Sequence, residues 1–218
     1  MIAVVDYCKG NLKSVERGLR AVGGDACITD DPTVIEKADA IVLPGVGAFA
    51  DASKTMTETG QMEAIRKAIK SGKPFLGICL GEHLLFSEGT EGAEGSVQTS
   101  EGLGCIEGVV DKMPEYDSND LRYKIPHVGW NSIEFDASCG CPLLESIKPG
   151  EYFYFTHSFI APKSEATVAT TTHSITFPSV VHCGEAVYGV QFHPEKSSDA
   201  GAQVLKNFLS IVESTLSR

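Results

Sequence analysis

Several features are missing from this sequence, and each absence excludes a class of protein. No apolar run approaches the roughly 18 residues that a membrane-spanning helix requires, so we expect no contact with a membrane. No basic segment precedes an apolar one at the N-terminus, and we therefore expect no signal peptide. Positive charge is scarce: the net charge is −11 over 218 residues, which argues against binding to the phosphate backbone of nucleic acid.

Cysteine is present, but not in a pattern typical of disulfides or metal sites. The chain has seven cysteines, an odd number, and their spacing suggests no disulfide framework. Cys139 and Cys141 are too close for an ordinary disulfide or a zinc knuckle, and no matching pair lies nearby. We therefore expect a cytoplasmic protein with reduced thiols, no metal site and no other cofactor.

The first half of the chain alternates short apolar runs with amphipathic segments. With 42% hydrophobic and 22% charged residues, its composition is that of a globular protein, and its length favours one domain over residues 1–218. Strands are expected at residues 2–5, 26–29, 38–43 and 74–78, and helices at 11–21 (capped by Asn11), from 31, at 60–70 and at 80–86. This alternation predicts an α/β fold with an open, mainly parallel, doubly wound sheet and helices on both faces.

From residue 103 onward the pattern changes to strands with little helix between them. The expected strands are residues 105–112, 128–135, 152–157, 166–172, 179–182 and 186–192, the last two joined as a hairpin. We expect an antiparallel or mixed β extension of the sheet in this C-terminal half, forming a flap over one end. Residues 88–102 are predicted to form a mobile surface loop, and residues 198–216 the closing helix.

One stretch, Lys73–His83, places a cysteine between a strand and a helix. Cys79 follows a buried apolar run and is flanked by Gly77 and Gly81, which allow a tight turn. A thiol at a helix N-terminus faces unpaired backbone N–H groups and the positive end of the helix dipole, and both favour the thiolate. On this stretch alone, Cys79 is either a nucleophile or a buried structural thiol.

A nucleophilic cysteine needs a base and a group that orients the base. The apolar run ending at Phe192 is followed by His193, Pro194 and Glu195. In extended backbone, residues i and i+2 point the same way, so Glu195 can reach the imidazole of His193. By itself this segment is also typical of a surface turn. Together with Cys79, it predicts a Cys–His–Glu catalytic triad.

The two triad motifs resemble those of the class I, triad-type glutamine amidotransferases. Further stretches are similar to the glutaminase subunits of imidazole glycerol phosphate synthase, from histidine biosynthesis: Asp6–Leu12, Leu43–Phe49, Pro126–Asn131, Tyr152–Ser158 and His193–Ser197. The resemblance covers nearly the whole chain. It implies that the chain hydrolyses L-glutamine to glutamate and ammonia. It also implies a heterodimer with a barrel-type cyclase subunit, which uses the ammonia to make imidazole glycerol phosphate and aminoimidazole carboxamide ribotide.

The loop Pro44–Ala48 follows a predicted strand and has three interpretations. Its two glycines form an incomplete dinucleotide-binding fingerprint or a plain tight turn. The resemblance implies a third role, in which Gly45, Val46 and Gly47 supply a backbone N–H to an oxyanion hole. The N–H of Leu80, next after the nucleophile, is then the second donor.

The resemblance also identifies a glutamine pocket and two departures from the family pattern. His157, Ser158 and Phe159 lie at a predicted strand end, and they match the stretch that holds the amino-acid end of glutamine, largely through backbone groups. His83 stands where the family usually has a substrate-contacting glutamine. Two outcomes are open: substrate contact is kept, with a pH dependence near the titration of histidine, or substrate binding is weakened. Cys8 stands where the family has glycine.

Two alternative functions stay open at this point. A non-catalytic relative would keep the triad fold and regulate a partner without hydrolysing glutamine, and only His83 favours it. A glutaminase of another class I system would serve anthranilate or nucleotide synthesis. At the partner surface, His127 is expected to play a structural part, Lys196 is solvated or lies at the edge, and Trp130 is a core or an interface residue.

Overall fold

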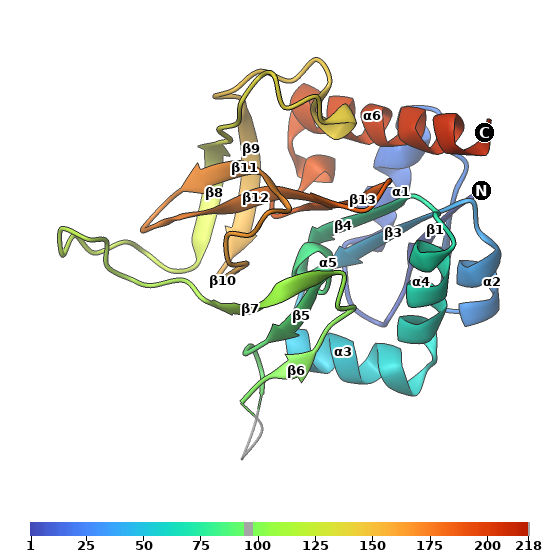
Figure 1. The fold of residues 1–218 in the computed structure, drawn as a ribbon, viewed down its shortest axis with the longest axis horizontal. Coiled ribbons are helices and arrows are strands. Elements are labelled where there is room, and N and C mark those ends of the chain that lie inside the picture. The colour runs from blue at the N-terminus through green and yellow to red at the C-terminus, as the bar shows by residue number, and fades with distance from the viewer. Residues whose placement is uncertain (94–97, 218) are drawn as a thin grey trace.

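The centre of the protein is a seven-stranded sheet, shown in Figure 1. The computed structural model describes residues 1–93 and 98–217. The strands of this sheet are β1 (Ile2–Val5), β2 (Ala26–Thr29), β3 (Ala40–Gly45), β4 (Phe75–Cys79), β11 (Thr167–Thr172), β12 (Thr176–Cys183) and β13 (Val187–Val190). Their order is β11-β12-β13-β4-β3-β1-β2. The last five strands in this order are parallel, and β12 runs antiparallel to both of its neighbours, β11 and β13. This confirms the predicted mainly parallel sheet and the hairpin between β12 and β13.

Helices cover both faces of the sheet, as predicted (Figure 1). One face carries α1 (Leu12–Ala21) and α6 (Ser198–Leu216), and the other carries α2 (Pro32–Lys37), α3 (Phe49–Glu58) and α4 (Gln61–Lys70). The strands serve both layers because successive side chains point to opposite faces. In β1, Ile2 and Val4 belong to the core beneath α1 and α6, whereas Ala3 and Val5 belong to the core on the other face.

The remaining strands form two smaller sheets. One contains β5 (Phe86–Gly89), β6 (Ser100–Glu101), β7 (Ile106–Lys112) and β10 (Phe159–Ile160), and the other pairs β8 (His127–Ser132) with β9 (Tyr152–His157). Short 3₁₀ turns occupy Pro142–Leu144 and Pro194–Lys196. Strand β9 lies at the carboxyl end of the parallel strands, where the backbone N–H of His193 donates to the carbonyl of Tyr154 at 2.9 Å. This antiparallel pair therefore closes one side of that edge, as the predicted flap requires.

Several predicted boundaries are wrong for physical reasons. The helix predicted at 80–86 ends early: α5 spans Leu80–His83, and Phe86 begins β5, because Leu84, Leu85 and Phe86 are all buried and show no helical periodicity. Helix α3 was not predicted, and its buried side chains are Phe49, Ala52, Ser53 and Met56, of which only two are large and apolar. The predicted mobile loop contains the end of β5 and all of β6, which pair with each other, and its residues 94–97 lie outside the described residues.

Two further observations complete the fold. Asn11 precedes α1, but its side chain makes no capping hydrogen bond, contrary to the prediction. Within the ranges 1–93 and 98–217, no helix combines the length and the apolar character needed to cross a membrane.

Candidate active site

Cys79 lies on a sharp turn between β4 and α5. Its φ is +55° and its ψ −107°, a backbone conformation that residues other than glycine rarely adopt. The turn is tight enough to require small neighbours: a Cβ at Gly81 would collide with the carbonyl of Leu43, and one at Gly77 with the backbone of Gly81. The turn leaves Cys79 7% exposed, directly before the first N–H of a helix.

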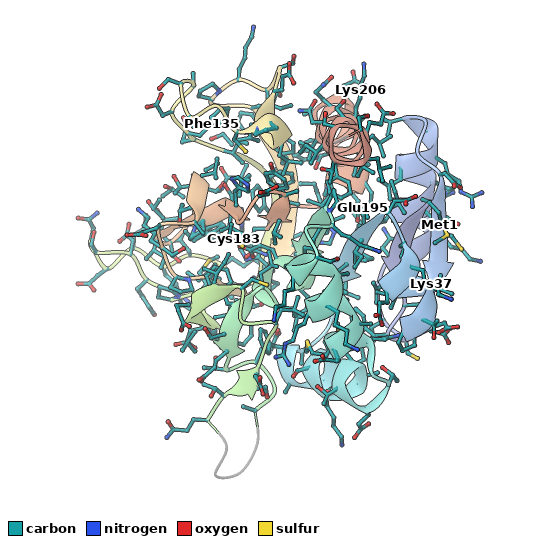
Figure 2. The ribbon with its side chains drawn as sticks, turned by 45° about the vertical axis from the view of Figure 1, so that its right-hand side comes forward. Met1, Lys37, Phe135, Cys183, Glu195 and Lys206 are labelled. Atoms are coloured by element: carbon teal, nitrogen blue, oxygen red, sulfur yellow. The ribbon has the colours of Figure 1, made fainter. Side chains whose placement is uncertain are left out.

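The parallel pairing of β13 with β4 brings the predicted base to this cysteine. Val190 is in register with Ile78, so the chain after β13 passes beside the turn that carries Cys79. The Nδ1–H of His193 donates to Oε1 of Glu195 at 2.9 Å. The other ring nitrogen, Nε2, is buried, makes no well-formed hydrogen bond and interacts with the Cys79 thiol. Glu195 lies near the centre of the molecule, below α6 (Figure 2).

The environment of His193 favours its charged form. Burial by itself lowers the pKa of this imidazole, but Cys79 and Glu195 outweigh burial and raise the pKa to about 9. His193 is therefore protonated at neutral pH, where it can pair with a thiolate and donate a proton to a leaving amine.

A cavity of about 380 Å³ opens beside Cys79, within the size range of small-molecule sites. Its lining includes seven of the predicted oxyanion and substrate-binding residues: Val46, Gly47, Leu80, His83, His157, Ser158 and Phe159. Gly45 is the exception. A Cβ there would lie 2.6 Å from Cβ of Leu80 and 2.7 Å from Oη of Tyr7, so this glycine allows β3 to pack closely against the turn.

His83 is in the cavity wall, but its ring is neutral. The side chain is almost fully buried, and its Nε2 lies 2.7 Å from Oε1 of Gln191. Burial lowers the pKa of His83 to about 4, although the hydrogen bond to Gln191 opposes this. The expectation of a pH dependence near the ordinary titration of histidine is therefore wrong, because the ring stays uncharged above about pH 4.

His157 belongs to a chain of hydrogen-bonded side chains behind the cavity. Its Nδ1–H donates to the carbonyl of Phe159 at 2.9 Å, and its Nε2 lies 3.0 Å from Nδ1 of His127. Nδ2 of Asn131 lies 3.2 Å from the other nitrogen of His127. Burial lowers the pKa of both histidines, to about 4 for His127, whose ring also stacks on His173. The imidazole of His157 is thus occupied, which leaves backbone groups of this stretch for a ligand.

Glu91 and Gln191 are polar residues of the site that were not predicted. Glu91 lines the cavity, and burial raises the pKa of its carboxyl group. Gln191 is fully buried, and its Nε2–H₂ donates to the Cys79 sulfur at 3.7 Å. A signal for Gln191 was present, because it stands two residues before His193 at the end of the strand predicted at 186–192, and residues i and i+2 of a strand point the same way. No such local signal marks Glu91.

Across the described parts of the chain, no cluster of three or more His, Cys, Asp or Glu side chains is arranged to hold a metal ion. All seven cysteines are free thiols. The site thus offers a thiol, an imidazole and a carboxylate, together with backbone N–H groups at the start of a helix, which suit nucleophilic attack on an acyl group.

Comparisons with known proteins agree with this chemistry. The family model "Glutamine amidotransferase class-I" matches residues 3–212. The chain is 43% identical to the imidazole glycerol phosphate synthase subunit HisH of Caldanaerobacter subterraneus subsp. tengcongensis, over 98% of this chain and 99% of the relative. It is 40% identical to the HisH subunit of a Geobacillus species, over 98% of each chain. Among solved structures, "Crystal structure of glutamine amidotransferase" superposes with a TM-score of 0.72 at 18% identity, over 98% of this chain and 100% of the other, which is a likeness of fold.

Proposed function

The chain belongs to the class-I glutamine amidotransferases and, among them, to the HisH subunits of imidazole glycerol phosphate synthase, and from this premise we propose that it hydrolyses L-glutamine with Cys79, His193 and Glu195. The ammonia passes to a cyclase subunit that makes imidazole glycerol phosphate and aminoimidazole carboxamide ribotide in histidine biosynthesis. The observation that carries the triad assignment is the 2.9 Å hydrogen bond between His193 and Glu195, beside the buried thiol on its strained turn.

In the first half-reaction, the Cys79 thiolate attacks the carboxamide carbon of glutamine. The C–N bond breaks, the His193 imidazolium donates its proton to the leaving ammonia, and a glutamyl thioester remains on the sulfur. Glu195 orients the imidazole and stabilises its positive charge through the Nδ1–H bond. In the second half-reaction, His193 removes a proton from water, which attacks the thioester and releases glutamate and the thiol.

Two groups of cavity residues support the handling of substrate. The N–H of Leu80 has no partner within its helix, since Leu80 is the first residue of α5. We assign it to the oxyanion, together with an N–H from the Gly45–Gly47 segment, and two such donors are worth several kcal/mol, roughly 3 each. The backbone of His157–Phe159 holds the amino-acid end of glutamine, and the half-buried carboxylate of Glu91 receives its ammonium group.

We place the cyclase interface on the outer face of the pair β8–β9. Three large apolar side chains are exposed there, with exposed fractions of 55% for Val128, 51% for Trp130 and 56% for Tyr152. The Lys196 ammonium group lies 5.8 Å from the ring centroid of neighbouring Tyr154. Exposed aromatic side chains of this kind are typical anchors of protein interfaces. Trp130→Ala should weaken cyclase binding about tenfold or more in a calorimetric titration, whereas unchanged affinity would place the interface elsewhere.

The test of the catalytic assignment uses Cys79→Ala in complex with the cyclase. This variant should lose glutamine-dependent product formation, while synthesis from added ammonium salt continues at the wild-type rate, because the cyclase is intact. Cys27→Ala, a change at a half-buried thiol outside the cavity, is the matched control. Loss of both activities would instead indicate that Cys79 is structural, and retention of both would rule out thiol catalysis.

The two alternative functions predict other results. A non-catalytic relative would show no glutamine hydrolysis in the complex, and a subunit for anthranilate or nucleotide synthesis would not bind the cyclase. We also place the reaction in the cytoplasm. The seven free thiols support this, since reduced cysteines persist in reducing compartments.

A further inference from the structure

Gln191 lies between the sulfur of Cys79 and the uncharged imidazole of His83. Its carboxamide is fully buried, with Nε2 3.7 Å from Sγ of Cys79 and Oε1 2.7 Å from Nε2 of His83. Its backbone is fixed by a hydrogen bond from its N–H to the carbonyl of Ser179 at 3.1 Å. The side chain therefore has one end on the reacting sulfur and the other on a histidine that the triad does not use.

The orientation of this carboxamide decides its effect on the sulfur. With the NH₂ group toward Cys79 it stabilises a thiolate, whereas with the oxygen toward Cys79 it repels one. His83 selects the first orientation, because an N–H on its Nε2 can bond only to the amide oxygen. The carboxyl group of Glu82, with its nearest oxygen 3.6 Å from the same nitrogen, makes no hydrogen bond, so the amide oxygen of Gln191 is the partner of Nε2. Cys79 and His83 both line the cavity.

We propose that Gln191 is a further catalytic residue, which donates a hydrogen bond to the Cys79 thiolate, and that His83 is a positioning residue, which holds the Gln191 carboxamide in the donating orientation. The proposal rests on the proposed glutaminase function. It also explains how histidine serves at a position where the resemblance implies glutamine: either side chain can donate an N–H to Oε1 of Gln191.

Other titratable groups also interact with the Cys79 sulfur, and a test of Gln191 must leave them unchanged. Among the described residues, His193 and Tyr7 interact with Cys79, and both stay unchanged in the variants below. Gln191 differs from these groups in carrying no charge at any pH. Its replacement by leucine therefore changes the stability of the thiolate without adding or removing a titrating group.

The experiment measures how fast iodoacetamide alkylates Cys79 as a function of pH, followed by mass spectrometry of the Cys79 peptide. It also measures kcat and KM for glutamine in the cyclase complex. Gln191→Leu should raise the pH midpoint of alkylation by about one unit. It should lower kcat by about ten- to a hundredfold, with little change in KM. Gln191→Glu keeps the shape but removes the N–H donors, and should raise the midpoint at least as far.

Variants of His83 separate positioning from packing. His83→Leu should shift the midpoint in the same direction as Gln191→Leu, and His83→Gln should restore the wild-type midpoint. The matched control is Gln61→Leu, which removes another buried carboxamide, one that donates to the carbonyls of Asp6 and Asp30 at 2.8 and 3.0 Å. It should leave the midpoint unchanged.

The outcomes distinguish this proposal from the proposed function. A wild-type complex that hydrolyses no glutamine would overturn the function, and the alkylation profiles would still report the contact between Gln191 and the sulfur. An unchanged midpoint in folded Gln191→Leu and Gln191→Glu would overturn the catalytic role of Gln191, even if kcat fell. An unchanged midpoint in His83→Leu would overturn the positioning role.

Discussion

A histidine lies on each side of Cys79. The two side chains are buried to about the same degree, but their pKa values are shifted in opposite directions. On the triad side, His193 is 2% exposed and has a pKa of about 9. On the other side, His83 is 3% exposed and has a pKa of about 4. Burial lowers the pKa in both places. The difference comes from the partners: His193 interacts with Cys79 and with the Glu195 carboxylate, whereas His83 bonds to the neutral carboxamide of Gln191. The charge of the partner, more than the depth of burial, therefore sets the protonation state.

The comparison separates two kinds of chemistry around one sulfur. The side of the proposed triad holds a proton on His193 at neutral pH, which the proposed mechanism transfers to the leaving ammonia. The other side holds only dipoles, because His83 is neutral and burial raises the pKa of Glu82 well above its ordinary value. Fixed dipoles stabilise charge without taking a proton from the reaction. A change at Glu195 should therefore alter the pH dependence of the reaction, whereas a change at Glu82 should alter the stability of the fold.

The largest effect is expected from Glu195→Gln, which removes the charge on the triad side. In the proposed mechanism the reaction needs protonated His193, so kcat/KM should fall as the pH rises through about 9, which is the alkaline limb of the pH profile. Without the carboxylate, burial is opposed by Cys79 alone, the pKa of His193 drops, and this alkaline limb moves to lower pH. At pH 8 the rate should fall about a hundredfold or more.

The measurement is kcat/KM for glutamine from pH 6 to 10 in the cyclase complex. Glu213→Gln makes the same change of charge at an exposed position of α6 and should leave the profile unaltered. An alkaline limb that stayed near pH 9 in Glu195→Gln would break the comparison, because the charge of the partner would then not set the pKa.

A smaller effect, on stability, is expected from Glu82→Met on the neutral side. The Glu82 carboxyl is fully buried, and neither oxygen has a hydrogen-bond partner. Its pKa is raised by burial above the ordinary 4.5. As the pH rises above 4.5, the unfolded chain loses this proton while the folded chain keeps it, so the stability of the fold declines. A methionine of similar shape removes both the buried polar group and this loss, and should raise the free energy of unfolding by about 1–3 kcal/mol.

Urea unfolding at pH 5 and pH 8 checks this prediction. The gain in Glu82→Met should be larger at pH 8, because the loss in the wild type grows with pH. Glu63→Met, at an exposed position of α4, should change the free energy of unfolding by less than about 0.5 kcal/mol at both values. A gain that is equal at pH 5 and pH 8 would show that Glu82 does not titrate differently in the folded state.

The two sides of Cys79 also differ in how far the sequence predicts them. The sheet follows from periodicity, which is a property of short segments. The contact between His193 and Glu195 was predicted from extended backbone, but Glu195 lies in the 3₁₀ turn Pro194–Lys196, and this turn brings its carboxylate to the imidazole. The contact from Gln191 to His83 joins residues 108 positions apart, and no local pattern encodes it. Cys8 illustrates a conformational limit: its φ of +68° explains why the resemblance implies glycine there, but a cysteine in the sequence does not indicate that angle.

Asn11 gives the smallest predicted effect and the finest test of the triad side. Its side chain was expected to cap α1, but it makes no capping hydrogen bond, and its Nδ2 lies 3.5 Å from Oε1 of Glu195. A hydrogen bond at this outer limit is weak, so Asn11→Ala should lower kcat/KM by no more than about threefold. Asn11→Asp instead adds a second carboxylate near the imidazolium and should move the alkaline limb above the wild-type value, opposite in sign to Glu195→Gln. If Asn11→Asp moved the limb downward, or Asn11→Ala cost tenfold or more, the asparagine would orient Glu195 through its hydrogen bond rather than merely lie beside it.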